Sequence, residues 1–315
     1  MKVFVAGATG AMGAHLIGML VANGHDVVGT TRSEAKFDQI RALGAEPVVM
    51  DALDADAVAQ AVGHADPDVI THQLTALSRD FDMKHFDEVF AETNRLRTEG
   101  TDHLLSAGRA VGVKRFVAQS FAGWTGGKGR GPAATEDEPL RPPAEIFRST
   151  LEAIRHLEDA VTTATWTEGI VLRYGGFYGP GTGMALDPPG DQAEMIRKRK
   201  FPIVGDGAGV WSFVHIADAA AATLAAIEHG EPGVYNIVDD EPAPVAQWLP
   251  AVAEAVGAKK PRRLPRWLGR LAAGEGAVVM MTEVRGASNE KAKRELGWRL
   301  RYPTWRQGFV NGLGA

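Results

Sequence analysis

The sequence predicts an α/β fold, doubly wound around a mostly parallel sheet, with a smaller C-terminal lobe. Short apolar segments rich in β-branched residues alternate with longer segments whose apolar residues recur at helical period, as in consecutive strand–helix units around a parallel sheet. This alternation continues to about residue 239, and amphipathic helical segments follow it. A length of 315 residues fits one large domain or one domain with a smaller lobe.

Composition restricts the functional class. Hydrophobic residues make up 45% of the chain and charged residues 23%, so a sizeable core is expected. The net charge of −5 comes without a basic stripe, which argues against a nucleic-acid partner. No apolar run could span a bilayer and no signal peptide precedes the first strand, so we expect a cytoplasmic enzyme without a membrane partner. Without cysteine, thiol catalysis and cysteine-ligated metals are excluded, and no other metal-ligand spacing occurs.

The first residues of the chain have the pattern of a dinucleotide-binding turn. A buried strand at residues 3–6 is followed by three glycines at three-residue spacing and then by a helical apolar pattern. Such a turn lets the backbone approach a pyrophosphate, which then lies at the positive end of the helix. The pattern predicts a nucleotide-binding Rossmann sheet, although an ordinary tight turn would have the same glycines. The predicted contacts in the turn are Gly7, Thr9, Gly10, Ala11, Met12 and Gly13.

The end of the second strand indicates which dinucleotide is bound. Binders of NAD(H) usually have an acidic residue here, which accepts a hydrogen bond from the ribose 2′-hydroxyl. This sequence has Thr31 followed by Arg32 and Ser33, with Lys36 one turn further on. Because a guanidinium binds a 2′-phosphate and a carboxylate repels it, the sequence favours NADP(H). The alternative is that Arg32 is a solvated surface residue.

Two further strand ends carry polar side chains at the same edge of the sheet. The third strand is followed by Asp51, which could accept a hydrogen bond from the adenine amino group, with Ala52 and Leu53 beside it. Asp54 is expected to cap the next helix. The fourth strand ends at His72. That position makes His72 a catalytic candidate, while a structural role is the alternative.

Five motifs resemble those of the extended short-chain dehydrogenase/reductase family, in its epimerase/dehydratase branch. They are GATGAMG at 7–13, Asn94 within TNRLRTEGTDHLL, LRYGGFYGPG at 172–181, FVHIADAA at 213–220 and KAKRELGW at 291–298. The resemblance covers nearly the whole chain. It implies an NADP-binding Rossmann domain at residues 1–175 with about 213–238, a substrate lobe at 176–212 and 239–315, and a homodimer formed through the helices after the fourth and fifth strands.

The catalytic motif of the family is where this sequence departs. The family uses a Tyr-x-x-x-Lys pair on the helix after the fifth strand, in which the ammonium lowers the pKa of the phenol for proton exchange with the substrate. Matching that helix puts Phe147 at the tyrosine and Leu151 at the lysine. The serine that the family has at the end of the fifth strand falls at Phe121, one residue after Ser120.

Three residues are candidates for the missing proton transfer: Tyr174, His72 and Ser120. No tyrosine precedes residue 174, so a shift of register does not restore the pair. Tyr174 follows the sixth strand, near the expected nicotinamide, and is also a predicted cofactor contact. With an ordinary pKa of about 10 a tyrosine stays protonated at neutral pH, which favours reduction of a carbonyl over oxidation of an alcohol.

The substrate region also departs from the nucleotide-sugar members of the family. These members usually have an arginine before the FVHI-like segment, where this chain has Trp211 and Ser212. Five aromatic residues could line an apolar cleft or simply pack the core between the lobes. They are Phe121, Trp124, Phe147, Phe177 and Trp211. A non-sugar substrate that is partly aromatic or apolar is therefore expected.

Three functions fit these observations. The leading hypothesis is an atypical NADP(H)-dependent oxidoreductase that acts on a small non-sugar carbonyl compound or enone. A catalytically silent NADP(H)-binding sensor is the alternative from another functional class, because the Tyr–Lys pair is missing. The third is an epimerase or dehydratase that uses the bound cofactor transiently. The sequence leaves the substrate and the direction of the reaction open.

Overall fold

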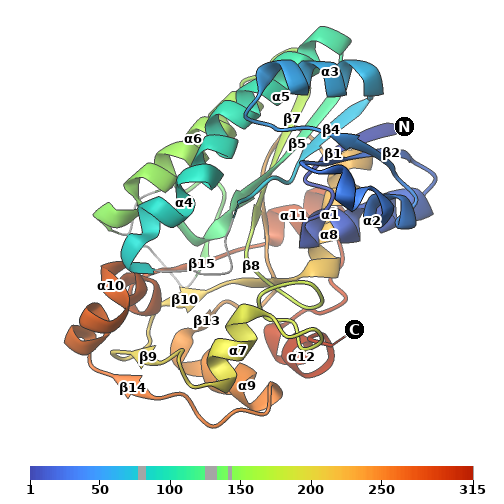
Figure 1. The fold of residues 1–315 in the computed structure, drawn as a ribbon. Helices are drawn as coiled ribbons and strands as arrows, with labels where there is room; N and C mark the ends of the chain where they lie inside the picture. The colour runs from blue at the N-terminus through green and yellow to red at the C-terminus, as the bar shows by residue number, and fades with distance from the viewer. Residues whose placement is uncertain (77–82, 125–132, 141–143, 315) are drawn as a thin grey trace.

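The central feature of the fold is a seven-stranded parallel sheet with the order β12-β7-β5-β4-β1-β2-β3 (Figure 1). The computed structural model describes residues 1–76, 83–124, 133–140 and 144–314. The chain winds outward from β1 in one direction and from β4 in the other, so the crevice between their carboxyl ends is a switch point where α/β proteins bind ligands. The strands are β1 (Lys2–Ala6), β2 (Asp26–Thr31), β3 (Glu46–Val49), β4 (Val69–His72), β5 (Arg115–Phe121), β7 (Glu168–Tyr174) and β12 (Gly233–Ile237).

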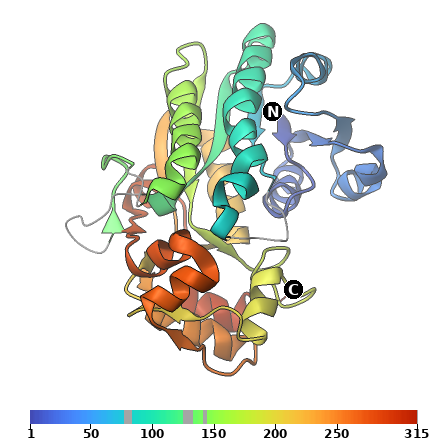
Figure 2. The ribbon, with the colours of Figure 1, turned by 60° about the vertical axis from the view of Figure 1, so that its left-hand side comes forward.

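Helices cover both faces of this sheet (Figures 1 and 2). One face packs against α3 (Ala55–Ala65), α5 (Thr101–Val111) and α6 (Arg148–Thr162), and α4 (Phe86–Arg95) lies against α6. The other packs against α1 (Ala11–Ala22), α2 (Phe37–Ala42), α8 (Ile216–His229) and α11 (Glu290–Glu295). Alternation along β1 explains this arrangement, because Val3 and Val5 face α1 while Phe4 and Ala6 face α3 and α5.

A smaller lobe lies beyond the carboxyl ends of β5 and β7 (Figure 2). Its core is built around the fully buried Trp248 and Trp305. The helices of the lobe are α7 (Asp191–Arg197), α9 (Val245–Ala255), α10 (Arg266–Thr282) and α12 (Trp305–Asn311). Short strand pairs connect them: β8 (Gly176–Tyr178) with β11 (Phe213–His215), β9 (Ile203–Val204) with β14 (Arg263–Leu264), β10 (Val210–Trp211) with β13 (Ala243–Pro244), and β6 (Ala133–Ala134) with β15 (Gly286–Ala287).

Several short helical turns complete the described chain. Four are 3-10 turns: η1 (Glu34–Lys36), η2 (Met83–His85), η4 (Ala122–Trp124) and η5 (Glu145–Phe147). The fifth, η3 (Leu96–Gly100), is a π-helical turn that joins α4 to α5. The sequence predicts one regular helix here. A π turn widens the helix locally and changes which side chains face the sheet, and such turns are frequent at functional sites.

The predicted α/β fold is confirmed, with one difference at the C-terminus. Residues 239–315 were expected to belong to the lobe, but Ala292, Leu296 and Trp298 pack in the core on the α1–α8 face of the sheet. The other predicted domain boundaries stay predictions. Within the described ranges, no helix combines the length and hydropathy that crossing a membrane requires.

Candidate functional site

The glycine turn between β1 and α1 has the geometry that a pyrophosphate needs. Gly7 has a φ of 102°, and a Cβ there would lie 2.8 Å from the Gln73 carbonyl oxygen. A Cβ at Gly13 would lie 2.2 Å from the Gly7 carbonyl oxygen, so glycine is required for the helix to pack on the turn. Gly10 begins α1 without a side-chain cap, and the first turn contains no acidic residue. The free N–H groups of this turn therefore fit a phosphate.

The other residues predicted in the turn contribute through different atoms. Thr9 and Ala11 are half-buried beside Gly10. The Met12 side chain is 4% exposed and packs in the core, which leaves its backbone for a ligand. The loop after β8 lies against the same helix, because His15 Nε2 donates to the Pro180 carbonyl oxygen at 3.2 Å. The turn and the beginning of the lobe therefore adjoin.

The residues predicted to select the nucleotide lie at the ends of β2 and β3. Arg32 is exposed, and its guanidinium donates to Glu92 on α4 at 2.7 Å. Ser33 caps η1 by accepting from the Ala35 N–H. Asp51 accepts from the Leu53 N–H at 3.0 Å, while Ala52 between them is buried. Asp54 caps α3 as predicted, through the N–H groups at positions 56 and 57.

His72 is engaged by the backbone through both ring nitrogens. Its Nε2 donates to the Leu96 carbonyl oxygen at 3.1 Å, and its Nδ1 accepts from the Leu74 N–H at 3.2 Å. The side chain is 1% exposed, and burial lowers the pKa of His72 to about 4. A neutral ring with both nitrogens occupied has no proton for a substrate. The catalytic role predicted for His72 is replaced by a structural one.

Tyr174 lies in the core rather than at a cleft. Its hydroxyl is 2.6 Å from Thr223 Oγ1 on α8, and 1% of the residue is exposed. Burial raises the pKa of Tyr174 well above its usual range. The ring packs among the residues that α1 and α8 place against the sheet, so it does not present its phenol to a substrate. Neither role predicted for Tyr174, proton donor or cofactor contact, fits this position.

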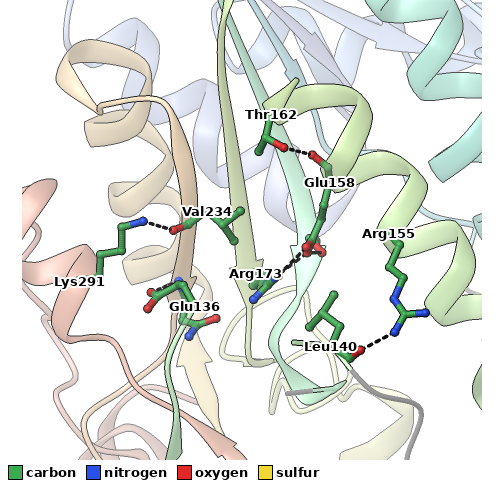
Figure 3. A network of polar contacts seen from close by, with 10 residues as sticks. Glu136, Leu140, Arg155, Glu158, Thr162, Arg173, Val234 and Lys291 are labelled. Atoms are coloured by element: carbon green, nitrogen blue, oxygen red, sulfur yellow. Dashed lines mark hydrogen bonds and ion pairs between the residues drawn. The ribbon is translucent and has the colours of Figure 1, made fainter. Parts of the chain in front are cut away.

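Ser120 lies on the opposite face of the sheet from Tyr174 and belongs to a buried ionic network. Its hydroxyl donates to Glu158 Oε1 at 2.6 Å. The same carboxylate accepts two hydrogen bonds from the Arg173 guanidinium, at 2.8 and 2.6 Å (Figure 3). All three residues are at most 6% exposed. The structure therefore does not bring Ser120, His72 and Tyr174 together as one catalytic group.

The positions of the missing Tyr–Lys pair lie in an apolar cluster. Phe147 is fully buried and packs edge-on against Phe86, with ring centroids 4.7 Å apart. Leu151 is 1% exposed in the same cluster, which Phe121 also joins. A Cβ at Gly276 of α10 would lie 3.2 Å from Phe147 Cζ, so the lobe covers this ring.

The described members of the aromatic set that the sequence suggested lie in three different clusters, which is the arrangement expected for core packing. Phe177 packs with Tyr174 on the other face of the sheet, with ring centroids 5.2 Å apart. Trp211 packs against Trp248 in the lobe at 4.9 Å and donates its indole N–H to the Met280 carbonyl oxygen. The Trp124 side chain lies outside the described residues.

A buried arginine next to the ionic network was missed by the sequence reasoning. Arg97 lies in η3 and is 9% exposed. It donates one long hydrogen bond, 3.4 Å, to Asn94 Oδ1, and the Asn94 amide donates to Thr150 Oγ1 of α6. The sequence carried a signal for the ionic network, because Arg173 follows the apolar run at residues 170–172, but it carried none for Arg97 itself.

Comparisons with known proteins agree with this architecture. A family model described as the NAD dependent epimerase/dehydratase family matches residues 3–238. The chain is 45% identical over 312 residues to a 3-diazoavenalumate denitrifying reductase of a Streptomyces species, covering 98% of this chain and 99% of the relative. It is 28% identical over 98% of its length to a 4-hydroxy-2-methyl-3-oxo-4-farnesyl-3,4-dihydroquinoline-1-oxide ketoreductase of Stigmatella aurantiaca, 95% of which is covered. The Thermus thermophilus UDP-glucose 4-epimerase in complex with NAD superposes with a TM-score of 0.75, at 25% identity, covering 99% of this chain and 98% of that one.

Proposed function

The chain belongs to the NAD-dependent epimerase/dehydratase family, and we propose that it is an NADP(H)-dependent reductase whose substrate carries a diazo group. The observation that carries this proposal is that, among the residues that the structure describes, apolar side chains stand where the family has its proton-transfer groups. Phe147 and Leu151 occupy those positions in an apolar cluster. Ser120, His72 and Tyr174 are all buried and hydrogen-bonded to the protein.

The chemistry of the group that receives the hydride decides which substrate suits a site without a proton donor. A carbonyl that receives a hydride becomes an alkoxide and needs an acid to protonate it. A diazo group in its diazonium form, R–N₂⁺, does not. Its overall reduction, R–N₂⁺ + H⁻ → R–H + N₂, breaks the carbon–nitrogen bond and consumes no proton. The product carbon gains the hydrogen and its two electrons, and dinitrogen leaves.

The residues that would hold the cofactor are those of the turn and of the two strand ends. In this proposal the N–H groups after Gly10 bind the pyrophosphate, Arg32 binds the 2′-phosphate and Asp51 binds the adenine. When bound, the reduced nicotinamide supplies the hydride. The Arg32–Glu92 pair is largely exposed, with side chains 71% and 49% accessible, so it contributes little to stability and a phosphate can replace Glu92.

The relatives support a reductase more than the other hypotheses. The 45% identical relative is named for reductive removal of nitrogen from 3-diazoavenalumate, and the two sequences match over almost their whole lengths. This supports an enzyme over a silent sensor. The carbonyl substrate expected from the sequence remains a second candidate, because a 28% identical relative is a ketoreductase.

The test is a stoichiometric assay with the purified chain. We expect 3-diazoavenalumate to be reduced with NADPH, with one molecule of N₂ released for each NADPH oxidised. Arg32→Asp should shift the preference from NADPH toward NADH by about a factor of ten or more, because the variant loses a charge-assisted hydrogen bond and gains a repulsive charge. NADPH oxidation with a ketone but not with the diazo compound would replace the proposal by the carbonyl alternative. An unchanged NADPH/NADH ratio in Arg32→Asp would refute the role of Arg32.

A further inference from the structure

Arg97 lies at the carboxyl edge of the sheet, where a substrate of this family of folds must bind. The neighbouring Leu96 carbonyl oxygen accepts from His72, the last residue of β4. On the other side, Asn94 connects the Arg97 guanidinium to Thr150, which precedes Leu151 on α6. The guanidinium is therefore held between the end of β4 and the part of α6 where the family has its lysine.

The Arg97 side chain has few partners for a buried cation. A guanidinium has five N–H donors, yet Arg97 uses one of them, at 3.4 Å, among the residues that the structure describes. The nearby Glu158 is occupied, because both of its oxygens accept from Arg173 and one accepts from Ser120. Glu136 approaches Arg173, not Arg97. Burial lowers the pKa of Arg97 to about 10, which leaves the group charged at neutral pH.

Such an arrangement is unfavourable for stability unless something else binds there. Arg97 is largely removed from water and has one weak protein partner, so a hydrophobic residue of similar size is often neutral or stabilising in its place. Its remaining N–H groups are not fully sealed from solvent, so a ligand can reach them. A π turn is itself a local departure from regular helix that occurs frequently at functional sites. A buried cation with free donors, presented by such a turn beside the expected site of hydride transfer, indicates an anionic ligand.

We propose that Arg97 binds an anionic oxygen of the substrate, either a carboxylate or a phenolate. The inference rests on the proposed function, because it assigns a binding residue to that same site. Arg97 on η3 then supplies a positive charge close to the position on α6 where the family has the ammonium of its lysine. Its role is to hold the substrate rather than to transfer a proton, because a guanidinium remains protonated throughout the neutral range.

The experiment measures anion binding without turnover. The complex of the protein with NADP⁺ is titrated with benzoate, which presents a carboxylate, and separately with 4-nitrophenolate, whose absorbance reports a bound phenolate. We expect at least one anion to bind, and Arg97→Met to weaken it about tenfold to a hundredfold, the loss of one charge-assisted contact. Arg97→Lys should recover part of the affinity. Arg109→Met, at an exposed position on α5, is the matched control and should bind like the original chain.

Comparing benzoate with 4-nitrophenolate shows whether the site binds a carboxylate or a phenolate. The stability of Arg97→Met in urea shows whether Arg97 serves ligand binding or the fold. Arg97→Met should unfold at the same or a higher urea concentration than the original chain, because it removes a poorly paired buried charge. Equal affinity of Arg97→Met and the original chain for both anions would overturn the proposal, as would binding of neither anion by the original chain. Because no hydride transfer is needed, the titration stays valid even when 3-diazoavenalumate is not reduced.

Discussion

The glycine turn after β1 and the edge formed by β5 and α6 are both parts of the crevice in which the family does its chemistry, yet they have diverged differently. The turn keeps Gly7, Gly10 and Gly13 in the geometry that a pyrophosphate requires. The edge has Phe147 and Leu151 in place of a phenol and an ammonium. The turn therefore keeps a backbone geometry that fits a cofactor, whereas the edge has apolar side chains at the two positions where the family has its phenol and ammonium, as the proposed function requires.

The two regions depend on different atoms, which explains why they change separately. A glycine turn of this kind binds a pyrophosphate through backbone N–H groups, so it requires positions without side chains where the backbone approaches closely. The edge acts through side chains on one helix face, and these can be exchanged for apolar residues without disturbing the backbone. Replacement at the edge then strengthens packing, because Phe147 joins Phe86 and Leu151 in one buried cluster.

The largest effect that we expect follows from filling the turn. In Gly13→Val the new Cβ would lie 2.2 Å from the Gly7 carbonyl oxygen, so the helix must move away from β1. We expect loss of NADP⁺ binding, measured by calorimetry, with a large decrease in the free energy of unfolding. The matched control is Gly18→Ala on the same helix, where an added Cβ meets nothing within 4 Å. That variant should bind normally and be more stable by up to about 1 kcal/mol. Normal binding by Gly13→Val would remove the turn from the site.

A second prediction tests the edge by restoring the family's residues. The double variant F147Y/L151K puts a hydroxyl on a ring carbon that faces Gly276 and an ammonium at a position that is 1% exposed. We expect it to lose about 4 kcal/mol or more of stability in urea unfolding, because both polar groups are buried without designed partners.

The opposite outcome of the F147Y/L151K experiment, a stable variant, would be informative about function. Leu151→Met is the control and should lose less than about 1.5 kcal/mol, since it conserves volume and polarity. A stable F147Y/L151K variant that gained ketone reduction would show that the edge still has the form of a proton-transfer site. The contrast between the turn and the edge would then be one of side chains alone.

The sequence predicts those parts of the site that depend on local pattern. The spacing of Gly7, Gly10 and Gly13 between an apolar run and a helical period is enough to predict the turn, and Asp54 is recognisable as a helix cap. The strand and helix order follows from periodicity in the same way. Each of these features is decided by neighbours within a few residues in the chain.

The catalytic candidates were harder to predict because their roles depend on register and direction. In the structure Ser120 pairs with Arg173 and Phe121 with Tyr174, so Ser120 and Tyr174 point to opposite faces of the sheet. The register between two strands that are distant in the sequence cannot be predicted from the sequence of either strand alone. Arg97 was missed for a related reason, because a regular helical period through residues 86–111 does not anticipate the π turn that places it.

The smallest effect that we expect concerns His72, the last residue of β4, which lies between the glycine turn and the edge formed by β5 and α6. Its pKa is lowered to about 4 in the folded protein, whereas an unfolded histidine titrates near 6.5. Between these values the unfolded chain binds more protons, so stability decreases as the pH falls from 7 to 5, by about 2 kcal/mol from this group. His72→Gln removes the titration and should reduce the difference between urea midpoints at pH 7 and pH 5. Because both ring nitrogens bond to the backbone, the variant should also keep its cofactor affinity at pH 7. An unaltered pH dependence would mean that His72 has the same pKa in the folded and the unfolded chain, so that the ring can take up a proton near pH 6, and it would then return as a proton donor at the edge.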